Sequence, residues 1–313
     1  MRAQLAFVTP RKLPKAASIH GRVVVLDVAF ASEASGGGFE KITKPFIDGL
    51  GVRLAAWVDH HDHAMHAQYN HDPRFVLTTK AEHGACPEMI SEELCARVGL
   101  VDTIVCHTDF DGLCSAAKWL REGREPYPGA DNDARAIDTR LGTPSAIARR
   151  FDRAIRARPR DTGLLGIVVR HLAAGLAEKS LWVPIDEAGA ELHAIERVTM
   201  DLARGYRRID IAKPCLPACT SVAFVDVTEP RKMYSTRYDK TMLLLIGQER
   251  ASVAIVIDGD TMTLAAPFDS NIHFLELLGL SGGMPTLVSV QKSRLVEVLM
   301  RLGVPRSEID GIG

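Results

Sequence analysis

Two stretches of the sequence decide the fold, RLAAWVDHH at residues 53–61 and VDTIVCHTDFDG at residues 101–112. In each of them an apolar run is followed at once by histidines and aspartates. Apolar runs of this length with polar ends are typical of buried strands in an α/β sheet. The polar residues then lie at the carboxyl ends of the strands, which is where open sheets bind ligands.

The phrase HTDFDG at residues 107–112 spaces its ligand-type side chains at alternate positions. His107, Asp109 and Asp111 can therefore face one cavity where the strand opens into a loop. Gly112 lets the backbone turn without a Cβ clash. The next segment, LCSAAKWLREG, predicts a helix, and a helix N-terminus beside carboxylates suits phosphate held through a divalent metal. Imidazole mixed with carboxylates suits Mn²⁺ better than a thiolate-rich zinc site would.

A third predicted strand end carries a lone carboxylate. RVVVLDVAF at residues 22–30 puts Asp27 directly after four apolar β-forming residues. Three strand ends with metal-binding residue types would rarely occur together by chance, so their joint presence favours a metal site. We expect Asp27 to bridge two ions.

On these phrases, over residues 20–142, the chain resembles the DHH phosphoesterase superfamily, whose signatures are the DHH triplet and HxDxDG. That family includes RecJ-type exonucleases, oligoribonucleases, cyclic-dinucleotide phosphodiesterases and inorganic pyrophosphatases. The resemblance implies two divalent metals, usually Mn²⁺, with Mg²⁺ as the alternative. It implies these ligands: for one ion His107, Asp109 and Asp27, and for the other Asp111, Asp27, His60 and a fourth carboxylate.

The fourth carboxylate has three candidates. Asp138 in ARAIDTR looks like the family's residue because an Asp-Thr pair often stands there, and Asp131 and Asp133 in GADNDAR are its rivals. The motif order is also rearranged, since HxDxDG normally comes first and here follows Asp27 and the DHH triplet. A parallel sheet tolerates such a change if the strands keep their places, because the site depends on geometry and not on chain order.

The predicted reaction is hydrolysis in which the two ions polarise a phosphoryl oxygen and lower the pKa of an attacking water. His61 and Arg140 are expected to steady the negative charge that develops. Asp59 is expected to orient a ligand imidazole rather than to bind metal. The other histidines of this loop are expected to be solvated, namely His63, His66 and His71.

The predicted fold class is α/β, with three parts along the chain. Residues 1–142 form a mainly parallel-sheet DHH-type domain behind a polar lead-in at residues 1–20, residues 143–210 form a helical linker, and residues 211–313 form a smaller α+β domain. Four segments of the last part read as hairpin-like strands: SVAFVDV, TMLLLIG, ASVAIVID and TMTLAAP. KSRLVEVLMRLG predicts a closing amphipathic helix.

The C-terminal part has a weaker resemblance to the DHH-associated domain, which grips the substrate through a glycine-rich phrase with a histidine. Here the phrase is LSGGMP at residues 280–285, with Gly282 and Gly283 as the expected substrate contacts. Met284 stands where the histidine is expected, so the sequence does not select one substrate among a short oligonucleotide, a cyclic dinucleotide, polyphosphate and pyrophosphate.

The amino-acid composition limits the kinds of binding partner that the sequence predicts. A net charge of −1 argues against a long nucleic-acid track, and an aromatic content of 6% makes a RecJ-like single-strand exonuclease the weaker alternative. The six cysteines form no dense framework and no apolar run could span a bilayer, which favours a reduced, cytoplasmic protein without a membrane partner. The sequence thus predicts a metal-dependent phosphoesterase for a small phosphate ester or short nucleotide. The alternative from another class is a non-catalytic module that senses nucleotide or metal.

Overall fold

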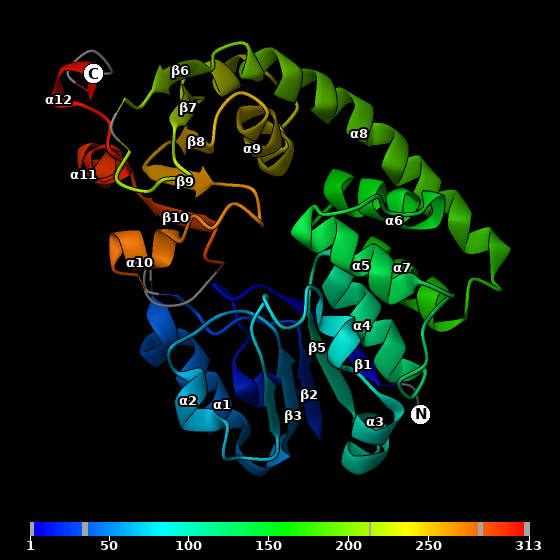
Figure 1. The fold of residues 1–313 in the computed structure, drawn as a ribbon. Coiled ribbons are helices and arrows are strands. Elements are labelled where there is room, and N and C mark those ends of the chain that lie inside the picture. The colour runs from blue at the N-terminus through cyan, green and yellow to red at the C-terminus, as the bar shows by residue number, and fades with distance from the viewer. Residues whose placement is uncertain (1–2, 33–36, 213, 281–283, 310–313) are drawn as a thin grey trace. The chain divides into compact units, whose positions relative to one another are not determined.

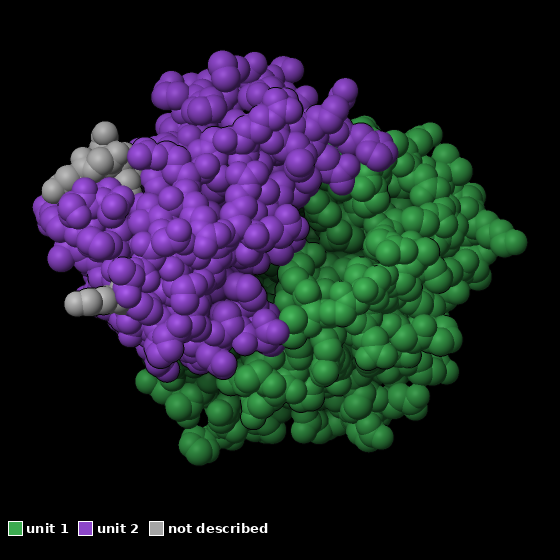
Figure 2. All heavy atoms as spheres, turned by 45° about the horizontal axis from the view of Figure 1, so that its top comes forward, with its two compact units in different colours: residues 1–192 green, residues 193–313 purple. Residues whose placement is uncertain are grey.

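The structure, a computed structural model, describes residues 3–32, 37–212, 214–280 and 284–309. The chain divides into two compact units, Met1–Leu192 and His193–Gly313, which Figure 2 colours separately. Each unit has its own five-stranded sheet with helices packed on it (Figure 1). The chain is therefore α/β, as the apolar runs predict.

The sheet of the first unit has parallel pairing between all of its neighbouring strands, in the order β1-β5-β2-β3-β4. Its strands are β1 (Gln4–Val8), β2 (Val23–Leu26), β3 (Leu54–Asp59), β4 (Phe75–Leu77) and β5 (Thr103–His107). The strands predicted from the three polar-ended runs are thus β2, β3 and β5, and they are neighbours. Because they are parallel, their carboxyl ends meet at one edge of the sheet.

The polar lead-in expected at residues 1–20 is wrong, because β1 lies inside it and pairs with β5 from Gln4↔Thr103 to Val8↔His107. β1 is an edge strand whose side chains are mostly part-buried. A short edge strand of this kind lacks the continuous apolar run that marks a central parallel strand.

The helices of the first unit begin at recognisable caps. Ser91, Asp109, Ser145 and Asp161 each accept a hydrogen bond from a backbone N–H in the first turn of the helix that follows. The helices are α1 (Lys44–Leu50), α2 (His66–Tyr69), α3 (Glu92–Val98), α4 (Phe110–Leu120), α5 (Ala130–Thr139), α6 (Ala146–Ala157), α7 (Thr162–Ala173) and α8 (Trp182–Ala203). The helix predicted after HTDFDG is α4, but it begins inside that phrase, at Phe110, so that Asp109 is its cap and Asp111 lies in its first turn. It is buried over nearly its whole length.

Residues 143–210 are mainly helical as predicted, but α6 and α7 do not form a separate linker. Phe151 of α6 and Leu165 and Leu172 of α7 belong to the same buried core as the strands and α4. An amphipathic helix must bury its apolar face, and α6 and α7 do so inside the first unit. The division between the units falls within α8, between Leu192 and His193.

The second unit has a mixed sheet in the order β10-β9-β8-β7-β6, in which β7 and β8 are parallel and the other pairs antiparallel. Its strands are β6 (Arg207–Asp210), β7 (Ser221–Asp226), β8 (Val253–Asp258), β9 (Thr261–Ala265) and β10 (Leu287–Gln291). Its helices are α9 (Lys240–Gln248), α10 (Phe274–Leu278), α11 (Leu295–Leu302) and α12 (Arg306–Ile309). The hairpin between β8 and β9 and the closing helix α11 are as predicted.

The strand predicted at TMLLLIG is wrong, because these residues lie in α9. Asp239 caps this helix and accepts a hydrogen bond from Met242 N at 3.0 Å. Parallel strands such as β7 and β8 need a crossover connection, usually a helix, so the segment between them could not be a hairpin strand.

None of the described helices is long and apolar enough to cross a membrane. All six cysteines lie among the described residues, and all are free thiols.

Candidate metal centre

The carboxyl ends of β5, β2 and β3 bring three polar segments together. The register pairs Leu26 of β2 with Val58 of β3 on one side and with Cys106 of β5 on the other. The next residue along each strand is therefore Asp27, Asp59 or His107. This is the juxtaposition that the three polar strand ends predict.

Asp27 occupies the middle of this edge with a side chain that is 1% exposed. Its backbone has φ 57°, a left-handed conformation that costs a residue with a Cβ about 1 kcal/mol or more. Its Oδ1 lies 3.3 Å from His60 Nε2 and its Oδ2 lies 3.6 Å from His107 Nδ1. Among the residues that the structure describes, neither oxygen has a hydrogen-bond partner. A buried carboxylate whose two oxygens each face an imidazole could hold a cation together with those rings.

One group of ligand atoms comes from Asp27, His107 and Asp109, all within 4.8 Å of one another. His107 Nδ1 lies 2.7 Å from Asp109 Oδ2, while Asp109 Oδ1 accepts a hydrogen bond from Gly112 N at 3.1 Å. A Cβ on Gly112 would meet the carbonyl oxygen of His107 at 2.8 Å. Glycine is therefore needed here because the first turn of α4 passes directly against the end of β5.

A second group comes from His60, Asp111 and Asp138. His60 Nε2 lies 3.3 Å from Asp111 Oδ2 and 3.9 Å from Asp138 Oδ2. His60 Nδ1 lies 2.8 Å from the carbonyl oxygen of His83, which can only accept a hydrogen bond. Nδ1 must therefore carry the proton, which leaves Nε2 to bind a metal, as is usual for ligand histidines. Asp27 and His60 also form a third group with His61.

The structure brings only one of the three candidates for the fourth carboxylate into these groups. Asp138, on the last turn of α5, lies beside His60. Asp131 is bonded by the ammonium of Lys118. Asp133 accepts hydrogen bonds from Tyr127 and Ser145, so its carboxylate is used in joining α5 to the start of α6.

The other predicted site residues lie in different surroundings. His61 Nδ1 is 2.8 Å from Asp59 Oδ1 and 3.9 Å from Asp27 Oδ1, so Asp59 fixes the His61 ring at the edge of the centre. Arg140 is exposed and follows α5 directly, with φ 64°. Gly282 and Gly283 lie outside the described residues.

Lys80 is a buried residue of the centre that the sequence analysis missed. Its side chain is 2% exposed and its Nζ donates a hydrogen bond to Asp138 Oδ2. It lies in the polar segment TTKAEHG after β4, where a lysine is normally solvated. The same segment supplies His83, whose carbonyl bonds His60, and leads to Cys86, whose N–H donates to Asp111 Oδ2 at 3.2 Å.

The electrostatics of the centre favour added positive charge. Burial lowers the pKa of His60, but the charge of Asp111 and the nearby carboxylate oxygens of Asp111 and Asp27, each 3.3 Å from His60 Nε2, raise it to about 11. Burial also lowers the pKa of His107, and the charge of Asp109 raises it well above its usual value. Burial and the charge of Asp27 raise the pKa of Asp111. The carboxylates thus hold protons on their neighbours, and metal binding would release those protons.

The donor set fits a divalent cation on a second ground. Buried ligand atoms without a hydrogen-bond partner gather in the centre: both oxygens of Asp27, Nε2 of His60 and Oδ1 of Asp111. Buried polar atoms are normally paired, so this set of carboxylate and imidazole atoms fits the ligands of a cation. Its oxygen and nitrogen composition suits Mn²⁺ or Mg²⁺ carboxylate chemistry more than thiolate zinc chemistry.

The expectation that the remaining loop histidines are solvated is wrong for His66. Its side chain is buried, with its ring 5.0 Å from that of Phe30 and its Nε2 4.0 Å from Asp59 Oδ2. Burial lowers the pKa of His66 to about 4, so it packs as a neutral ring. His63 is half-buried beside Phe30 and Phe39, and only His71 is exposed as expected.

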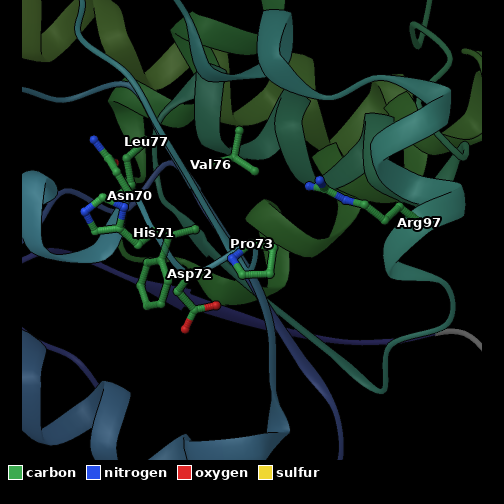
Figure 3. Close-up of a pocket in the computed structure, with 8 residues that line it drawn as sticks. Asn70, His71, Asp72, Pro73, Val76, Leu77 and Arg97 are labelled. Atoms are coloured by element: carbon green, nitrogen blue, oxygen red, sulfur yellow. The ribbon is translucent and has the colours of Figure 1, made fainter.

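A surface pocket lies along β4 and the segment before it (Figure 3). Its lining includes His71, Asp72 and Pro73, with Arg97 from α3. None of the lining residues belongs to a ligand group, so this pocket is separate from the candidate centre.

No protein-family model matches the sequence, and a search of curated proteins finds none that is similar to it.

Proposed function

We propose that the chain is a divalent-metal-dependent phosphoesterase of the DHH type, which hydrolyses a small phosphate ester or a short nucleotide. The observation that supports it most is Asp27, whose two buried, unpaired oxygens face different imidazoles. Each oxygen can serve one of the two ligand groups, so Asp27 is suited to bridge a pair of ions. Paired ions, most suitably Mn²⁺, supply Lewis-acid polarisation of a phosphoryl oxygen and acidify an attacking water.

The chain's own residues would hold and orient the reacting groups. His107 and Asp109 would hold one ion, and His60, Asp111 and Asp138 the other. Asp59, which bonds His61 Nδ1 at 2.8 Å, directs the opposite ring nitrogen of His61 away from itself. We propose that this nitrogen, Nε2, contacts a phosphate oxygen of the substrate. We assign the same task to Arg140, whose planar guanidinium matches phosphate geometry.

The proposed substrate is small because the chain offers little long-range attraction for a polyanion. Its formal net charge is −1, whereas proteins that track long nucleic acids have a basic face. Recognition would then depend on the phosphate group at the centre rather than on a basic groove.

The test is hydrolysis with Mn²⁺ across a panel of bis-p-nitrophenyl phosphate, pyrophosphate, polyphosphate, a dinucleotide, a cyclic dinucleotide and a longer single strand. The variant is Asp109→Asn, because asparagine caps a helix as well as aspartate does but lacks the charge. The matched control is Asp161→Asn in α7, whose carboxylate is also a helix cap and is 41% exposed against 45% for Asp109.

We expect Asp109→Asn to lower turnover by on the order of 100-fold or more, as loss of a centre residue does, and Asp161→Asn to leave it unchanged. Equal activity in both variants would contradict the proposed centre. No turnover on any substrate, with Mn²⁺ bound to the wild type, would support a sensing module instead.

A further inference from the structure

The two main ligand groups differ in one respect, which is the presence of a lysine. In the group of Asp27, His107 and Asp109, the ion pairs of the two carboxylates among the described residues are with histidines only. In the group of His60, Asp111 and Asp138, the ammonium of Lys80 bonds Asp138 Oδ2. One half of the centre thus contains a fixed positive charge and the other half contains none.

The position of Lys80 matters because the bonded oxygen is the one that faces the centre. Asp138 Oδ2 lies 3.9 Å from His60 Nε2 and is also the acceptor of the Lys80 hydrogen bond. An ion held by His60, Asp111 and Asp138 would need a carboxylate oxygen of Asp138 at that side. It would therefore compete with the ammonium for the oxygen or share the carboxylate with it.

The ammonium cannot leave this position at low cost. The Lys80 side chain is 2% exposed, and a buried charge that loses its partner is strongly destabilising. A divalent ion at this end would also be repelled by a unit charge only a few ångströms away, in surroundings where the screening by water is weak.

We propose that Lys80 is a built-in cation that makes the two metal positions unequal. This inference rests on the metal centre of the proposed function. The position at Asp27, His107 and Asp109 fills first and holds its ion tightly. The position at His60, Asp111 and Asp138 fills second and weakly, because Lys80 already neutralises Asp138. Activity of the enzyme would then follow the occupancy of the weaker position, and so the ambient metal concentration.

The experiment is a titration of the metal-free full chain with Mn²⁺, with free Mn²⁺ followed by its electron paramagnetic resonance signal. The variants are Lys80→Gln, which removes the charge but can still donate a hydrogen bond to Asp138, and Lys80→Met, which removes both. Lys80→Arg keeps the charge. Lys118→Gln is the matched control, because Lys118 is also buried and bonds a carboxylate, that of Asp131, outside the ligand groups.

We expect the wild type to bind one Mn²⁺ tightly and a second at least about ten-fold more weakly. Lys80→Gln and Lys80→Met should tighten the second ion by about ten-fold or more and leave the first unchanged. Lys80→Arg and Lys118→Gln should keep the wild-type pattern. Thermal melts of each variant show which of them are folded, and the Gln variant tests the inference even if the Met variant does not fold.

Two results would overturn the inference alone. The first is a wild type that binds two Mn²⁺ ions with equal affinity. The second is a second ion whose affinity in Lys80→Gln and Lys80→Met is unchanged or lower than in the wild type, as expected if Lys80 only positions Asp138. A wild type that binds no Mn²⁺ would instead overturn the proposed function together with the inference.

Discussion

In both units, parallel strands end at or next to an aspartate, but the partners of these aspartates differ. In the second unit, Asp226, the last residue of β7, pairs with Lys292 at 2.8 Å, and Asp258, the last residue of β8, pairs with Arg231 and accepts a hydrogen bond from Tyr238. In the first unit, Asp27 is buried without a hydrogen-bond partner among the described residues, and its ion-pair partners there are histidines. We infer that a strand-end aspartate can bind a metal where no lysine or arginine forms an ion pair with it.

The largest expected effect is on metal binding at these two kinds of aspartate. Asp27→Asn removes the charge that we propose bridges the two ions, so we expect Mn²⁺ affinity to fall by about 100-fold or more. Asp226→Asn removes a charge that Lys292 already neutralises, so Mn²⁺ affinity should not change. Isothermal titration calorimetry measures both. A similar loss in the two variants would remove the distinction between the units.

Bound metal should stabilise the first unit in particular. A ligand that binds only the folded state adds about 2.7 kcal/mol to the free energy of unfolding at a concentration of 100 times its Kd. We expect this gain with Mn²⁺ and its loss with a chelator or in Asp27→Asn, measured by denaturant unfolding. Hydrogen exchange should locate the added protection at the ends of β2, β3 and β5. Protection confined to the surroundings of Asp226 would contradict the assignment.

Two glycines of the first unit test how closely the centre is packed. Gly112→Ala would put a Cβ 2.8 Å from the His107 carbonyl oxygen, and overpacking of this kind costs about 1–3 kcal/mol. Gly166 in α7 has no atom within 4 Å of the same position, so Gly166→Ala should stabilise by about 0.4–1 kcal/mol. Thermal unfolding distinguishes the two signs. A neutral Gly112→Ala with unchanged Mn²⁺ affinity would show that β5 and α4 can separate there.

The smallest expected effect concerns a buried histidine outside the centre. His171 is fully buried against Phe151 and Trp182, and neither ring nitrogen has a hydrogen-bond partner within the described part of the chain. Burial lowers the pKa of His171, so the unfolded state binds its proton first and stability falls as the pH drops through about 6.5. His60, by contrast, is buried among carboxylates, which raise its pKa.

His171→Leu should therefore stabilise by roughly 1 kcal/mol at neutral pH, because it removes an unpaired polar group, and by more in acid. Denaturant unfolding from pH 5 to pH 7 measures the difference in slope. His193→Leu is the control, since it makes the same replacement at an exposed histidine. An unchanged slope in His171→Leu would mean that His171 finds a polar partner in solution.

The position of Asp27, His60 and His107 could be predicted because Asp27 and His107 directly follow a continuous apolar run and His60 stands one residue beyond another. Such runs fix a buried parallel strand, and parallel strands align their carboxyl ends. The pairing of β1 and the helix α9 could not be read in the same way. Their conformation is set by their neighbours, since β1 completes an edge and α9 has to connect two parallel strands.

The burial of Lys80 and His66 could not be predicted from the sequence for a related reason. A lysine and a histidine in polar loops are solvated in most proteins, and nothing in TTKAEHG or in the residues around His66 marks them as buried. Lys80 becomes buried because it meets Asp138, 58 residues later in the chain. His66 becomes buried because it packs on Phe30, from the segment after β2. Contacts of this length are products of the tertiary fold.

The most direct test of the metal centre is anomalous X-ray scattering at the manganese absorption edge from crystals of the full chain equilibrated with Mn²⁺. The proposal predicts a strong anomalous peak within bonding distance of Asp27, His107 and Asp109, and a weaker peak beside His60 and Asp111. Crystals that diffract well and show no anomalous peak at Asp27 would contradict it.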